Sequence, residues 1–129
     1  KTLDTKLMQE AALILSGVHD FSAFRSVNCT SKNPVKEIRE IIITNKRLHC
    51  STLQLEFEAN SFLQHMVRII TGTLVEVGLG RRKKDDLFKV LESGQRKFAG
   101  VTAPPHGLYS LEVIYPKGMI EWPLEVIDN

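Results

Sequence analysis

Residues Asn60 to Gly80 read NSFLQHMVRIITGTLVEVGLG, a largely apolar stretch that carries a single guanidinium, Arg68. Its apolar side chains recur at helical spacing from Phe62 to Val77, and at 1.5 Å per residue this part makes about four to five turns. We therefore expect a core helix that Asn60 or Ser61 caps. One narrow stripe of this helix holds its polar and small residues: Ser61, Gln64 or His65, Arg68, Thr71 or Gly72, and Glu76.

The make-up of this stripe indicates what it faces. A stripe in contact with water usually carries several lysines and glutamates, whereas this one offers a histidine, a threonine, a glycine and one arginine. Such a set suits the lining of a cleft, where Arg68 would need an acidic partner. The alternative is that the stripe faces solvent and Arg68 only keeps the helix soluble.

Composition sets few limits on function. A chain of 129 residues suits one domain, and 43% hydrophobic with 25% charged residues is ordinary for a soluble globular protein. The formal net charge is only +2, from 17 basic and 15 acidic residues. Any affinity for nucleic acid must therefore come from local clusters of basic residues.

The cysteines and histidines do not predict a metal site. Cys29 and Cys50 form no CxxC pair, and the four histidines lack ligand spacing. Two unpatterned cysteines favour a reducing, cytoplasmic location, with one disulfide bridge as the alternative. No apolar run is long enough to span a membrane, and no signal-peptide pattern opens the chain. Because the chain begins at Lys1 without an initiating Met, we expect a piece of a longer protein.

Two elements are expected at the start of the chain. Apolar spacing predicts a helix at residues 2–16, which Gly17 would end. The segment HDFSAFRS, residues 19–26, then offers Asp20 as the cap of a short turn. This turn would point two phenylalanines inward and leave Arg25 at its exit, where it could simply be exposed.

A hairpin is expected before the long helix. Alternating and β-branched residues at 35–44 and 48–59 flank a polar tip at 45–47. The second of these strands should be buried on one face and wet on the other. The buried face would carry Leu53, Leu55 and Phe57, and the wet face Gln54, Glu56 and Glu58.

After the long helix comes the basic run Arg81 to Lys84, followed by a short helix at 85–93 that Gly94 ends. Residues 101–107 read as a loop, and residues 108–115 alternate as a strand does, with a proline after them. This order of elements predicts an antiparallel sheet with helices packed on one face, an α+β fold.

Three segments resemble the TruA-type tRNA pseudouridine synthases, in the C-terminal half of their catalytic domain. They are HDFSAFRS at His19, ANSFLQHMVRIITGTLVEVG at Ala59 and TAPPHGLYSLEVIYP at Thr102. Their order and spacing also agree with that family, and the resemblance covers nearly the whole chain. It implies the ferredoxin-like half of the pseudouridine synthase fold and one domain over residues 1–129.

The resemblance implies an isomerase that detaches uracil from its ribose, rotates it and rejoins it through carbon 5, with no cofactor. In the family the nucleophile is an aspartate of the N-terminal half, in an Arg-Thr-Asp-x-Gly-Val-His-like motif that this sequence lacks. Arg68 matches the arginine that pairs with this aspartate. We therefore expect the chain to be inactive without the N-terminal half. The resemblance further implies action on the anticodon arm of tRNA and a homodimer.

The other candidate residues each have a structural alternative. Leu108 matches the family's aliphatic residue that packs against the target base, although it could be an ordinary core leucine. His65, one turn before Arg68, is a candidate for the cleft lining or a purely structural histidine. The basic run is expected to contact tRNA phosphates, or else is a solvated start of a helix. Its members are Arg81, Arg82, Lys83 and Lys84.

Two other classes of protein stay open from the sequence. One is an RNA-binding or ribosome-assembly module that kept the half-fold and lost the chemistry. An arginine kept in a cleft without its carboxylate argues against this module, since it has little structural justification. The other is a plain structural or interaction domain, which should not bind tRNA even at low salt.

Overall fold

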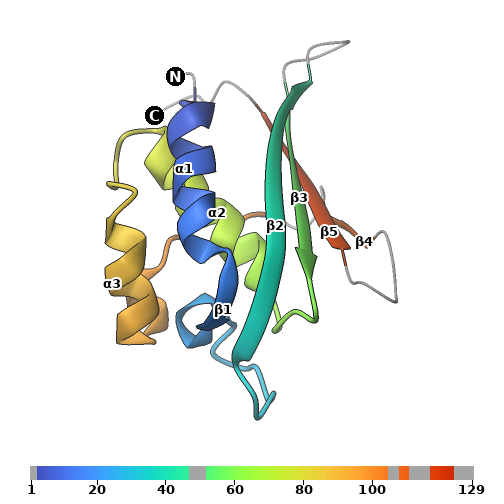
Figure 1. Ribbon diagram of the computed structural model, residues 1–129, viewed down its shortest axis with the longest axis vertical. Coiled ribbons are helices and arrows are strands. Elements are labelled where there is room, and N and C mark those ends of the chain that lie inside the picture. The colour runs from blue at the N-terminus through green and yellow to red at the C-terminus, as the bar shows by residue number, and fades with distance from the viewer. Residues whose placement is uncertain (1–2, 47–51, 105–107, 111–116, 124–129) are drawn as a thin grey trace.

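The computed structural model describes residues 3–46, 52–104, 108–110 and 117–123, and in these ranges five strands form one antiparallel sheet (Figure 1). Their order across the sheet is β1-β2-β3-β5-β4. The strands are β1 (Gly17–Asp20), β2 (Val35–Lys46), β3 (Thr52–Ala59), β4 (Leu108–Ser110) and β5 (Lys117–Pro123).

The three helices of the described chain all lie on one side of this sheet (Figure 1). They are α1 (Thr5–Leu15), α2 (Met66–Gly78) and α3 (Asp86–Ser93). Helix α1 packs against β2 and α2 against β5, while α3 lies outside them and contacts α1. The α+β class with helices on one face is therefore confirmed. Two short 3₁₀ turns, η1 (Ser22–Phe24) and η2 (Arg96–Phe98), complete the helical layer.

The core lies between the sheet and the helices. Leu53, Leu55 and Phe57 on β3 are fully buried, as their alternation predicts. Helix α2 is buried on almost every side, because it has the sheet on one side and α1 on another. Full burial of one such side chain contributes about 1.5–3 kcal/mol, so this layer is the main source of the fold's stability.

Gln9 joins α1 to the sheet. Strand β1 pairs with β2 only as far as Ile38, so the later backbone groups of β2 have no strand on that side. Gln9 replaces it, since its amide Nε2 donates to the Ile41 carbonyl at 2.8 Å and its Oε1 accepts from the Ile43 amide at 3.0 Å. These two bonds satisfy backbone groups that would otherwise be left unpaired at the edge of the sheet.

The expected start of the long helix is wrong. Helix α2 begins at Met66 rather than directly after Asn60 or Ser61, and His65 before it adopts the left-handed conformation with φ 63°. The Asn60 side chain bonds backbone amides outside the helix instead, because its Oδ1 accepts from Glu37 in β2 at 3.0 Å and from the adjacent Ser61 at 2.9 Å. Asparagine often competes with a helix in this way.

Other expected elements are confirmed with small changes. The first helix and the helix that Gly94 ends are present, and the hairpin pairs β2 with β3, although its tip lies outside the described residues. Of the last expected strand, only residues 108–110 are described. Gln54, expected in water, is instead 7% exposed, and its amide donates to Glu56. Strand β3 is flanked by both β2 and β5, so neighbours on two sides surround this side chain.

Candidate active site

Arg68 lies in the first turn of α2 and is half-buried. Its Nε donates to the Ala103 carbonyl at 2.7 Å, and the Ala103 amide donates to the Arg68 carbonyl at 3.0 Å. Within the described part of the chain, the two terminal nitrogens of the guanidinium have no hydrogen-bond or ion-pair partner. The side chain is therefore held by one edge while its other nitrogens remain able to bind a carboxylate.

The position of Arg68 also favours an anion. The N-terminal end of a helix carries a partial positive charge, since most of its first amides have no partner within the helix. A carboxylate bound to Arg68 would meet this potential as well as the guanidinium. Both effects favour the ionised form of an acid and lower its pKa.

The segment at residues 99–104 covers the polar stripe of α2. A Cβ placed on Gly72 would lie 1.7 Å from the Val101 carbonyl oxygen, so only glycine permits this approach. The Gly100 amide donates to Thr73 Oγ1 at 2.8 Å. Thr71 is fully buried, and its hydroxyl donates to the Val67 carbonyl. Within α2 the solvent-facing interpretation of the stripe is therefore wrong, whereas Gln64 and His65 before the helix are exposed.

A second arginine holds the same segment from the other side. Arg96, the first residue of η2, donates from Nη2 to Thr102 Oγ1 at 3.1 Å. The segment thus has separate attachments at residues 100, 102 and 103. A carbonyl held in this way fixes the direction of the Arg68 side chain.

The HDFSAFRS segment lies against the stretch before α2. The Asp20 carboxylate accepts from the Ser22 amide at 2.9 Å, but the residue that caps η1 is Phe21, so the expected cap is wrong by one residue. Phe21 and Phe24 are fully buried. The Ser26 amide then donates to the Gln64 carbonyl at 3.0 Å. All three segments that carry the resemblance therefore meet α2 or the residues just before it.

For His65 and Leu108 the structure shows the position in the fold but no contact that would assign a role. His65 immediately precedes α2 with an exposed side chain that makes no capping bond. Histidine tolerates the left-handed conformation better than most residues do, which accounts for its presence there. Leu108 begins β4, at the edge of the sheet, and pairs with Ile120 of β5. The Leu108 side chain lies outside the part that the structure describes.

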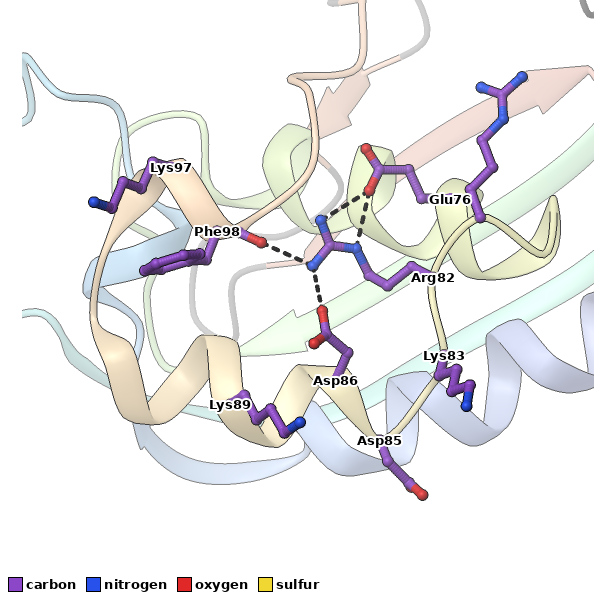
Figure 2. A pocket seen from close by; sticks show the side chains of 9 residues that line it. Glu76, Arg82, Lys83, Asp85, Asp86, Lys89, Lys97 and Phe98 are labelled. Carbon is purple, nitrogen blue, oxygen red and sulfur yellow. Dashed lines mark hydrogen bonds and ion pairs between the residues drawn. The ribbon is translucent and has the colours of Figure 1, made fainter.

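Two residues of the basic run make ion pairs within the fold. Figure 2 shows Arg82 between Glu76, Asp86 and the Phe98 carbonyl. Arg82 donates to these three groups at 2.9, 2.7 and 2.8 Å, respectively. Lys84 Nζ lies 2.9 Å from Glu10 Oε2, and this hydrogen bond with its charge raises the pKa of Lys84. Arg81 and Lys83 are exposed. Arg82 and Lys84 therefore have structural partners within the fold, which makes them less available for contact with RNA phosphates.

Cys29 is a free, half-buried cysteine, so the alternative of a disulfide does not hold for it. Hydrogen bonds from the backbone at Ser31 and Gln64, and the nearby Arg25, lower the pKa of its thiol. The described residues contain no cluster of three side chains that could hold a metal ion. None of the described helices has the length and apolar character needed to cross a membrane.

Comparison with known proteins agrees with this arrangement. The model of a family described as tRNA pseudouridine synthase matches residues 11–116. The chain belongs to the tRNA pseudouridine synthase family. Helix α2 with Arg68 and the covering segment at 99–104 both lie within the matched range, as does the HDFSAFRS segment.

Several curated relatives carry the name tRNA pseudouridine synthase A. The one from Aliivibrio salmonicida is 43% identical over 124 residues, which are 96% of this chain and 45% of the relative. The one from Myxococcus xanthus is 47% identical over 116 residues, or 90% and 43% of the two chains. The one from Pseudomonas aeruginosa is 42% identical over 123 residues, or 95% and 42%. The chain thus spans less than half the length of these synthases.

The sequence pattern singled out Arg68 but did not indicate what holds it. No sequence motif predicts the groups that hold the covering segment, which are the Ala103 carbonyl, Thr73 and Arg96. Backbone acceptors and buried hydroxyls occur in almost any sequence. One signal was present: Gly72 in mid-helix costs about 1 kcal/mol relative to alanine, so it indicates close approach of another backbone.

Proposed function

We propose that the chain is the C-terminal part of a tRNA pseudouridine synthase and that Arg68 is a catalytic residue. One observation carries this proposal: the guanidinium is fixed through Nε by Ala103, while its terminal nitrogens have no partner among the described residues. The partner that fits is the nucleophilic aspartate of an N-terminal half of the same protein. Membership of the family supports this pairing.

The proposed reaction converts uridine in tRNA to pseudouridine. The bond between uracil N1 and ribose C1′ breaks, the base turns, and a bond forms between C5 and C1′. C5 then loses its proton and N1, which is freed from the ribose, gains one, so atoms and charge balance and the isomerisation needs no cofactor. An arginine within about 4–6 Å of the aspartate would lower its pKa by ~1–3 units and keep it ionised.

The remaining residues have roles around the target base. An enzyme that acts on a base must take it out of its stack, and an apolar residue then fills the space or packs on the ring. Leu108 is proposed for this contact and His65 for the lining of the cleft. The proposal also includes the anticodon arm as substrate, a homodimer and the cytoplasm as the place of action.

The test restores the missing half. The N-terminal half of the Aliivibrio salmonicida relative is fused to this chain, and unmodified tRNA is assayed for pseudouridine. We expect product from the fusion and none from the chain alone. Product from the chain alone would contradict the proposed division of catalytic groups. A fusion that binds tRNA but yields no product would instead favour the RNA-binding module.

A further inference from the structure

We propose that a groove beside α3 binds the sugar-phosphate backbone of tRNA, separately from the site that takes the uridine. The inference rests on the proposed function in one respect, that the ligand is tRNA. The groove has a volume of about 580 Å³ and lies between the end of α2, α3 and η2 (Figure 2). Its lining residues are Glu76, Arg81, Arg82, Lys83, Asp85, Asp86, Lys89, Lys97 and Phe98.

The charge of the groove suits a polyanion. Five basic and three acidic side chains line it, an excess of two positive charges, and this equals the +2 of the whole 129-residue chain. The residues outside the groove therefore carry equal numbers of basic and acidic side chains, and the net positive charge lies in the groove. Such a local excess attracts nucleic acid even when the overall charge is near zero.

Arg82 removes most of the opposing negative charge. It lies at the base of the groove with its side chain 16% exposed, and it bonds both Glu76 and Asp86. Two of the three carboxylates are thus already paired with this half-buried cation. A phosphate entering the groove would meet only Asp85 as an unneutralised acid among these lining residues.

Three lysines remain available on the walls. Lys83, Lys89 and Lys97 are exposed and make no ion pair with any described residue. The ammonium of Lys97 lies 5.1 Å from the centre of the Phe98 ring, which restrains it beside the groove. A lysine ammonium acts as a point charge that attracts a phosphate, and such a contact does not depend on the base sequence of the RNA.

The groove is distinct from the Arg68 site. Glu76 follows Arg68 on the same helix, and at 1.5 Å per residue the two lie about 12 Å apart along its axis. One nucleotide cannot occupy both places. A tRNA whose uridine is at Arg68 would place a neighbouring part of its backbone in the groove.

The test compares two triple variants in the fusion with the N-terminal half. One replaces Lys83, Lys89 and Lys97 with glutamine, and the control replaces Lys6, Lys32 and Lys36, which lie away from the groove. Both remove three positive charges. The dissociation constant for unmodified tRNA is measured between about 50 and 200 mM salt, since each phosphate contact adds ~0.7–0.9 to the salt slope.

We expect the groove variant to bind at least about tenfold more weakly and to lose about two units of slope, while the control keeps the slope of the unsubstituted fusion. Equal slopes and affinities for groove variant and control would overturn the proposal. The two proposals fail separately: a fusion that makes pseudouridine with an unchanged groove variant refutes only the groove. A fusion without product, whose tRNA binding still depends on these lysines, refutes only the chemistry.

Discussion

The close packing of residues 99–104 on α2 predicts a large effect of Gly72→Ala. The new methyl group would lie 1.7 Å from the Val101 carbonyl oxygen and 2.9 Å from its carbon. Both atoms belong to the backbone, so no side-chain rotation relieves the clash. The segment must move away from the helix, and with it the Ala103 carbonyl that holds Arg68.

The cost follows from the contacts that this movement breaks. Overpacking of a buried site costs about 1–3 kcal/mol. The two bonds between Arg68 and Ala103 and the bond from Gly100 to Thr73 contribute about 1 kcal/mol each. Alanine in a helix returns about 1 kcal/mol. We therefore expect a loss of about 3–5 kcal/mol in the free energy of unfolding.

Gly78→Ala is the matched control on the same buried helix. Its methyl group would meet only side-chain atoms, Sδ and Cγ of Met8 at 2.7 and 2.9 Å and Cδ2 of Leu3 at 3.2 Å, which can shift without moving a backbone segment. Urea unfolding followed by circular dichroism should show a loss of about 1–2 kcal/mol for this variant, smaller than for Gly72→Ala. If Gly72→Ala unfolds within about 1 kcal/mol of the unsubstituted chain, the segment is not held on α2 as described.

Three further predictions address other parts of the structure. Arg82→Ala should cost about 2 kcal/mol in urea unfolding because it leaves two carboxylates and the Phe98 carbonyl without their donor, and an unchanged midpoint would contradict that role. Cys29 should be alkylated at lower pH than an unstructured cysteine peptide, since its pKa is lowered and the thiolate reacts; a rate profile matching the peptide would refute this. Arg25→Ala should raise that pH only slightly, because the backbone bonds are the larger cause. Leu108→Ala in the fusion should slow single-turnover formation of pseudouridine, and an unchanged rate would exclude its contact with the base.

Much of the fold followed from periodicity. The alternation of Leu53, Leu55 and Phe57 predicted the buried face of β3, and Gly94 marked the end of α3 with φ 63°. Strands β1 and β5 were not predicted. Strand β1 has only four residues, and β5 combines a glycine and a proline with few β-branched residues, so pairing with neighbours rather than local propensity decides them.

The candidate site was predictable only in part. Arg68 could be singled out because a charged side chain on an apolar helix requires polar partners. The structure shows one of them, the Ala103 carbonyl, which accepts from Nε. The start of α2 could not be placed, since Asn60 fits a helix cap and a strand end equally well in sequence. The sequence also could not show which residues of the basic run have partners within the fold. Glu10 lies 74 positions from Lys84, and no local pattern pairs them.

The single-turnover rate of Arg68→Ala in the fusion tests the central claim most directly. The single-turnover rate of the variant should be about 10²–10³ times lower than that of the unsubstituted fusion, while the dissociation constant for tRNA changes less than about threefold. Arg68→Lys should recover little, because lysine cannot form the bidentate fork, and Arg96→Ala should keep most of the rate although it also loosens the covering segment. A rate for Arg68→Ala within a few-fold of the unsubstituted fusion would contradict the pairing of Arg68 with the catalytic aspartate.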